Sequence, residues 1–128
     1  MEKIGFKGVI AWQKAMLIAK VIYSLTKKLP KVELFGLTNQ MRRAAVSIPS
    51  NIAEGYSRNS SKDYLRFLSI ARGSLAELET QLILCQEINY FSEGEIADCL
   101  TKIKEAGKIL NAMVNTITSK VKKETGKN

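Results

Sequence analysis

Basic and aromatic residues are interleaved in a short segment near the middle of the chain. Arg58, Lys62 and Arg66 recur every four residues, and Tyr56 precedes them. Cations of this kind hold a nucleic-acid backbone, while neighbouring aromatic rings stack on unpaired bases. Tyr64 falls in the apolar pattern of the next predicted helix, which leaves Tyr56 as the ring free to stack. The segment predicts either a contact with single-stranded RNA or DNA, or simply a solvated turn.

Arg42 and Arg43 form a second basic group, in the interior of a predicted helix. If that helix makes an antiparallel hairpin with the next one, both arginines lie near Glu77 and Glu79. An ion pair with these carboxylates is one interpretation, because the guanidinium fork matches a carboxylate. The other interpretation is a phosphate contact on the surface of an assembly. Both hold if one arginine pairs inward and the other faces solvent.

Lysines on the last predicted helix offer a further phosphate-binding surface. They are Lys102, Lys104, Lys108, Lys120, Lys122 and Lys123. Part of this charge is expected to be neutralised locally, because Asp98 lies four residues before Lys102 and Glu105 three residues before Lys108. A solvated helix face is the alternative.

The residue types present exclude most kinds of catalytic or metal site. The chain has no histidine and only two cysteines, Cys85 and Cys99, both at apolar positions, so we expect reduced core thiols, no metal and no cofactor. Histidine-containing di-iron and ribonuclease motifs cannot be built, and no glycine-rich phosphate loop occurs. We therefore expect no enzyme. An enzyme working with Arg and Glu alone, such as a bundle-type nucleotide transferase, is the third hypothesis.

The net charge is positive and unevenly distributed. The chain carries 20 Lys and Arg against 12 Asp and Glu, a net charge of +8. Residues 1–64 hold 11 basic and 4 acidic residues, and residues 65–128 hold 9 and 8. Such a charge suits a polyanion or serves solubility. Without a membrane-length apolar run or a signal-peptide pattern, we expect a cytoplasmic protein that does not contact membranes.

Apolar spacings of three and four residues predict an all-α protein. The expected helices cover about 9–29, 36–58, 61–89 and 93–122. Ser60 with Asp63, and Ser92 with Glu95, have the spacing of helix N-caps. Short connectors between long helices predict an up-down-up-down antiparallel four-helix bundle, in one domain over 1–128.

The first predicted helix has two apolar stripes. The second stripe consists of Trp12, Met16, Ala19 and Tyr23. Because one stripe is enough to pack the subunit's own core, we expect the second to form an oligomer interface.

Pro49 lies inside the second predicted helix. It cannot donate to the carbonyl of Ala45, so we expect a kink. Short polar side chains can satisfy freed backbone groups, and Ser47, Ser50 and Asn51 are in position to do so.

Small residues predict close contact between the second and third helices. A turn near Asn59 sets the segment AAVS (residues 44–47) opposite ARGS (residues 71–74). Gly73 is otherwise an unfavourable residue for a helix interior, by about 1 kcal/mol relative to Ala. We therefore expect the backbones to approach each other there.

Three segments resemble a known family: WQKA at 12–15, FGLTNQMRRAAVSIPSNIAEG at 35–55 and RFLSIARGSLAELETQL at 66–82. The family is the four-helix-bundle family named for the protein encoded by intervening sequences in bacterial 23S ribosomal RNA genes. The similarity covers nearly the whole chain. The sequence departs at Ser57, where the family often has Gly, and at Asn89, where Gly is expected. The first departure affects the loop after the second helix, and the second affects the cap of the third.

The resemblance implies a homopentameric ring with a central pore. The family is also similar in fold to the accessory protein that works with reverse transcriptase in diversity-generating retroelements, which looks like a basic ring that binds nucleic acid and its enzyme. Together with the residue types, the resemblance leads us to expect a non-enzymatic, oligomeric scaffold that contacts RNA or DNA phosphates, and the preference for RNA follows from the resemblance alone. A protein such as a reverse transcriptase is a further expected partner. The alternative function is a pure protein–protein interaction ring.

Overall fold

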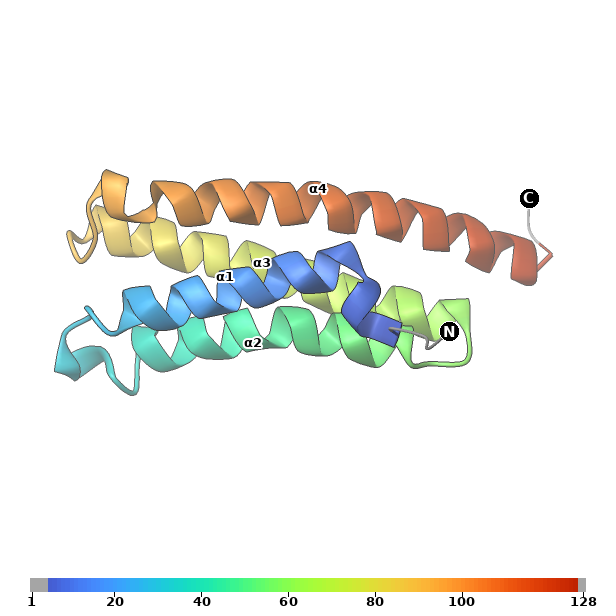
Figure 1. Cartoon of the computed structure of the whole chain (residues 1–128), viewed down its shortest axis with the longest axis horizontal. Helices are drawn as coiled ribbons and strands as arrows, with labels where there is room; N and C mark the ends of the chain where they lie inside the picture. The colour runs from blue at the N-terminus through green and yellow to red at the C-terminus, as the bar shows by residue number, and fades with distance from the viewer. Residues whose placement is uncertain (1–4, 127–128) are drawn as a thin grey trace.

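The computed structural model describes residues 5–126, and within them it contains helices and no strands. Four helices lie side by side along one axis: α1 (Ile10–Thr26), α2 (Leu37–Tyr56), α3 (Ser61–Glu87) and α4 (Glu93–Glu124) (Figure 1). Two short 3-10 turns, η1 (Gly5–Gly8) and η2 (Lys31–Glu33), precede α1 and α2. The predicted all-α four-helix architecture is confirmed. In the described part of the chain, no helix is both long and apolar enough to cross a membrane.

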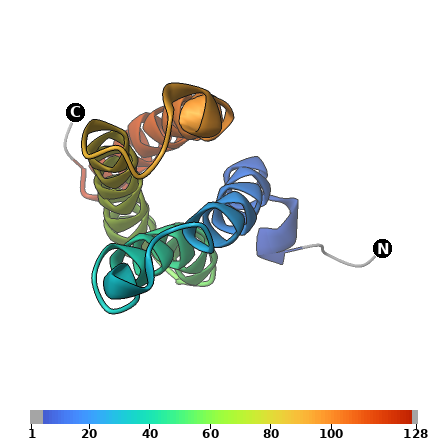
Figure 2. The same cartoon turned by 90° about the vertical axis from the view of Figure 1, so that its left-hand side faces the viewer.

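The four helices pack around one another, as the end-on view shows (Figure 2). Their apolar stripes meet in one core. Every residue of the first stripe on and just after α1 is buried: Ala11, Ala15, Ile18, Ile22, Leu25 and Leu29. On α3 the predicted stripe is buried from Leu68 to Cys85, with Tyr64 half-buried against the core. The spacing of three and four residues therefore identified the core-facing side of α1 and of α3.

The predicted N-caps are present. The Ser60 side chain accepts a hydrogen bond from the backbone N–H of Asp63 at 3.1 Å, at the start of α3. Ser92 and Glu95 form a reciprocal capping box on α4, in which each side chain accepts from the other's backbone N–H. Each cap satisfies N–H groups that the first turn of a helix leaves without partners.

Asn89 ends α3 in the left-handed backbone conformation, with φ of 65°. The backbone N–H groups of Tyr90 and Phe91 both donate to the carbonyl of Cys85, which closes the end of the helix. This conformation is the reason for expecting Gly here, and Asn tolerates it better than most other residues.

Helix α2 continues through Pro49. The Asn51 side chain donates to the carbonyl and hydroxyl of Ser47 at 2.8 and 3.0 Å, and not to the Ala45 carbonyl that the proline leaves free. The hydroxyl of Ser47 also lies 2.8 Å from that of Ser74 on α3. The prediction that Ser47, Ser50 and Asn51 satisfy the backbone group freed by Pro49 is therefore wrong for the Ala45 carbonyl in the described residues. Ser47 and Asn51 instead form a polar group that links α2 to α3, and Ser50 is exposed.

The prediction of a close approach at Gly73 is wrong. Gly73 is exposed, and a Cβ placed there meets nothing within 4 Å. The tight contact is at Gly55, where a Cβ would lie 2.8 Å from the Phe67 Cβ and 2.9 Å from a ring carbon of Tyr64. The backbones of α2 and α3 therefore approach each other closely near the turn that joins them.

The connector between α1 and α2 is fixed by one carboxylate. Glu33 accepts from the backbone N–H of Leu37 at 3.1 Å and from the Tyr90 hydroxyl at 2.8 Å. The phenol's hydrogen bond to this carboxylate raises the pKa of Tyr90. The same connector exposes Val32 and Phe35, at 84% and 89% of their full surface. We call this connector, residues 30–36, the apolar tip.

Candidate nucleic-acid interface

Two segments far apart in sequence meet at the end of the bundle opposite the apolar tip (Figure 1). The hydroxyl of Ser61, in the first turn of α3, donates to a carboxylate oxygen of Glu124, in the last turn of α4, at 2.9 Å. Lysines of α4 therefore join the basic residues of the α2–α3 turn. We call this group the cationic end: Arg58, Lys62, Arg66, Lys120, Lys122 and Lys123.

Arg58 and Arg66 are held over one aromatic ring. Their guanidinium carbons lie 4.8 and 4.4 Å from the centroid of the buried Phe67 ring. Arg58 also forms a salt bridge with Glu54 at 3.0 Å, and Arg66 lies 3.9 Å from Asp63. A cation over a ring contributes about 0.5–1 kcal/mol at an exposed site. Both guanidiniums are therefore pre-positioned while they remain accessible.

Tyr56 is the ring available for stacking. It is 45% exposed and contacts Tyr64 edge to face, with ring centroids 6.3 Å apart. Tyr64 packs against the core, and burial raises its pKa, with a smaller contribution from Tyr56. These positions agree with the prediction that Tyr64 packs in the core and that Tyr56 is accessible.

A hollow of about 670 Å³ lies beside these cations on the outer face of α3. Lys62 and Arg66 border it, and Leu65 and Ile70 give it apolar walls. Cations next to apolar surface suit a nucleotide, because the charge attracts the phosphate and the walls contact the base.

The α4 lysines divide into two groups. Lys120, Lys122 and Lys123 belong to the cationic end, whereas Lys104 lies 18 residues before Lys122, about 27 Å along the helix. Lys102 pairs with Asp98 at 3.0 Å, as predicted. The predicted pairing of Glu105 with Lys108 is wrong, because Glu105 lies 3.7 Å from Lys14 of α1.

Arg42 lies away from the cationic end, because it is 14 residues before the last residue of α2, Tyr56, or about 21 Å along the helix. Its guanidinium donates to the Thr26 hydroxyl at 2.9 Å and to the Tyr23 carbonyl at 3.5 Å, and it lies 4.6 Å from the Tyr23 ring centroid. It therefore links α2 to α1, and the predicted ion pair with α3 is wrong for this residue.

Arg43 is exposed on the same helix. It lines a hollow of about 340 Å³ together with Glu77 and Ser74 of α3. Within residues 5–126, Arg43 forms no ion pair with Glu77 or Glu79. The two arginines therefore take different roles, one between helices and one at the surface.

The second apolar stripe of α1 is partly covered by the chain itself. Phe6 of η1 packs on Trp12, with ring centroids 5.3 Å apart, and Met16 and Ala19 are half-buried. Tyr23 is 42% exposed beneath Arg42. Leu17, outside the predicted stripe, is 48% exposed, and the exposed apolar surface of α1 therefore differs from the predicted one.

Both cysteines are buried free thiols. Burial raises the pKa of Cys99 to about 11, and it raises the pKa of Cys85 as well, with a smaller contribution from Glu33. Over the described range, no three or more His, Cys, Asp or Glu side chains come together in a way that could bind a metal ion.

Fold and site together define a small antiparallel four-helix bundle with one strongly basic end. The sequence matches the family described as 23S rRNA-intervening sequence protein over residues 7–112. The chain belongs to that family, as the resemblance indicated. No curated protein matches the chain. The lysines that α4 contributes to the cationic end lie after the matched residues.

Proposed function

We propose that the protein is a non-enzymatic scaffold that binds single-stranded nucleic acid through the cationic end. The observation that carries this proposal is the meeting of six cations from two separate segments beside the accessible ring of Tyr56. Carboxylates nearby, such as Glu54, Asp63 and Glu124, are fewer than the cations. The family's name favours RNA over DNA.

The binding we propose is electrostatic and weakly dependent on sequence. Lysine and arginine side chains contact phosphates and release counterions, so affinity falls steeply as salt increases. The pre-positioned guanidiniums of Arg58 and Arg66 lose little conformational entropy on binding. Tyr56 adds stacking, which contributes about 1–3 kcal/mol per base.

Fluorescence anisotropy of labelled single-stranded RNA and duplex DNA, at several salt concentrations, tests this function. The variant Lys62→Ala/Lys122→Ala removes two cations of the site, and we expect the slope of log K against log salt to become shallower by about 1.4 for a single strand. The matched control, Lys20→Ala/Lys31→Ala, removes the same charge elsewhere. Absence of binding at low salt, or equal losses in both variants, would refute the proposal.

We also propose that subunits assemble into a ring, of the pentameric kind that the family resemblance implies. Exposed apolar residues on α1 and α2 support self-association, including Ile10, Leu17 and Val46. Assembly would multiply the cationic ends available to one strand, and with them the avidity. Light scattering should give five times the mass of one chain, and Leu17→Glu should reduce it. A monomeric mass at micromolar concentration contradicts the ring.

A protein partner is the second candidate function. The exposure of Val32 and Phe35 on a tip fixed by Glu33 supports it, because rigid exposed aromatic residues make effective interface anchors. A nucleic-acid-copying enzyme such as a reverse transcriptase is the partner class that a nucleic-acid-binding ring would serve. Co-purification of such an enzyme with the wild-type protein, but not with the Phe35→Ser variant, would support this role.

A further inference from the structure

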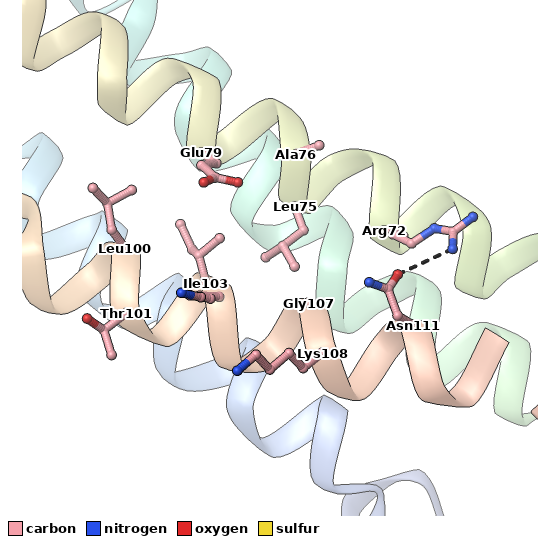
Figure 3. A pocket seen from close by; sticks show the side chains of 11 residues that line it. Arg72, Leu75, Ala76, Glu79, Leu100, Thr101, Ile103, Gly107, Lys108 and Asn111 are labelled. Atoms are coloured by element: carbon pink, nitrogen blue, oxygen red, sulfur yellow. Dashed lines mark hydrogen bonds between the residues drawn. The ribbon is translucent and has the colours of Figure 1, made fainter. Parts of the chain in front are cut away.

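A groove of about 690 Å³ runs between α3 and α4 (Figure 3). None of the residues that line it belongs to the cationic end. Its rim consists of exposed side chains, with Arg72 and Glu79 on α3 and Thr101 and Lys108 on α4. Leu75 points into it from α3. The groove is therefore an apolar channel between two charged edges.

Residues with small side chains line the middle of the groove. Gly107 of α4 and Ala76 of α3 both line it. A Cβ at Gly107 would meet only Leu75, at 3.6 Å, which is an ordinary contact. Packing within the chain therefore does not require this glycine, although glycine is less favourable than Ala in a helix interior. Its effect is to leave the floor of the groove open.

The rim carries cations that the chain does not neutralise. Arg72 donates to the amide oxygen of Asn111 at 3.3 Å, which leaves its charge uncompensated. In the part of the chain that the structure describes, Arg72, Lys104 and Lys108 form no ion pair. Glu79 is the acidic side chain that lines the groove. The rim therefore attracts a partner with negative charge.

The shape of the groove favours a helix over a small molecule. Sites for small molecules enclose most of the ligand's surface, whereas this rim is exposed along its length. The α4 residues from Leu100 to Asn111 span about 16 Å, or three helical turns. Small residues at the middle of the groove allow a helix from another molecule to approach α3 and α4 to the usual interaxial distance of about 8–10 Å.

We propose that the α3–α4 groove binds an acidic amphipathic helix of a partner protein. Its small apolar face would lie over Ala76 and Gly107, in the helix-in-groove mode. Lys104 and Lys108 are four residues apart on α4, so they match carboxylates spaced by three or four residues on the bound helix. This site is separate from the cationic end and does not depend on nucleic-acid binding.

The test uses a labelled 14-residue helical peptide with an Ala and Leu face flanked by Glu, and the same peptide with Lys in place of Glu. Fluorescence anisotropy against the full chain should show binding of the Glu peptide. Lys104→Glu/Lys108→Glu should weaken it about tenfold, because both surface ion pairs are lost and replaced by repulsion between like charges. The same double variant should gain affinity for the Lys peptide.

Gly107→Leu tests the shape of the site, and Gly107→Ala is its matched control. We expect the larger side chain to weaken the Glu peptide about tenfold, while circular dichroism shows an intact helical fold. The double variant Lys20→Glu/Lys31→Glu controls for net charge and should bind the Glu peptide like the wild type.

Three results would overturn the proposal. The first is no binding of the Glu peptide at low salt. The second is a loss of single-stranded RNA binding, and not of peptide binding, in Lys104→Glu/Lys108→Glu, which would assign the groove to nucleic acid. The third is a change in the protein's mass by light scattering in that variant, which would assign the groove to a second copy of this chain.

Discussion

Replacing Gly55 with Ala should destabilise the protein, although the same change at another helical glycine should stabilise it. The new Cβ would lie 2.8 Å from the Phe67 Cβ, 2.9 Å from the Tyr64 ring and 3.3 Å from the Tyr64 carbonyl oxygen. Two of these three atoms, the Cβ and the carbonyl oxygen, are fixed by the backbone of α3, so relief requires α2 and α3 to separate. Gly73 is the matched control, because its Cβ would meet nothing.

Two opposing effects set the magnitude. Overpacking costs about 1–3 kcal/mol, and contacts with backbone-fixed atoms place Gly55→Ala in the upper part of that range. The gain in helix propensity is at most about 1 kcal/mol. The net destabilisation is therefore about 1–2 kcal/mol, whereas Gly73→Ala should gain about 0.5–1 kcal/mol.

Urea unfolding followed by circular dichroism at 222 nm, at one protein concentration, measures both variants. The midpoint should fall for Gly55→Ala and rise for Gly73→Ala, with similar m-values, so that the change is one of stability. If Gly55→Ala were as stable as the wild type while Gly73→Ala gained as expected, close packing of α2 on α3 at this point would be refuted.

Three further outcomes are expected. Arg42→Ala should lower the free energy of unfolding by about 1–2 kcal/mol, because it removes the link to α1. Arg43→Ala should change the free energy of unfolding by less than about 0.5 kcal/mol. Equal effects of the two variants would contradict the different roles of these arginines. Below pH 9, Cys99 in the folded protein should react with a thiol reagent about tenfold more slowly than a thiol of pKa 9, because its thiolate is about 100-fold scarcer but more nucleophilic. Its contribution to stability, fully present below pH 9, should be lost between pH 9 and about 11. Comparing the urea midpoints of the wild type and Cys99→Ala at pH 8 and pH 10.5 checks this loss of stability. Ser92→Ala should cost about 1 kcal/mol of stability by removing the α4 cap, measured in the same assay.

The core was predictable because it depends only on helical periodicity. The same rule shows why the prediction for Gly73 failed. Gly73 is two residues from buried Ala71, about 200° around the helix, so it points outward. Gly55 is three residues after buried Ile52 and continues the inner stripe. The helical spacing in the sequence was therefore enough to predict that Gly55, and not Gly73, faces the inside of the bundle.

The candidate site was predictable only in part. The α2–α3 turn is local in sequence, so its basic and aromatic residues could be grouped without a structure. The joining of Lys122 to that turn depends on the length of α4 and on the register that places Ser61 beside Glu124. The bond from Arg42 to Thr26 depends on the rotamer of a long side chain, which periodicity does not determine.

The opposite ends of the bundle differ in chemistry, which gives the subunit a direction. One end is cationic, and the other presents Phe35 on a fixed connector. In a cyclic assembly whose symmetry axis runs along the bundles, every copy points the same way, so one rim gathers all the cations and the opposite rim all the aromatic tips. A dihedral assembly would instead place identical rims at both ends. The symmetry of the assembly would thus decide whether nucleic acid and a protein partner meet on one face or on opposite faces.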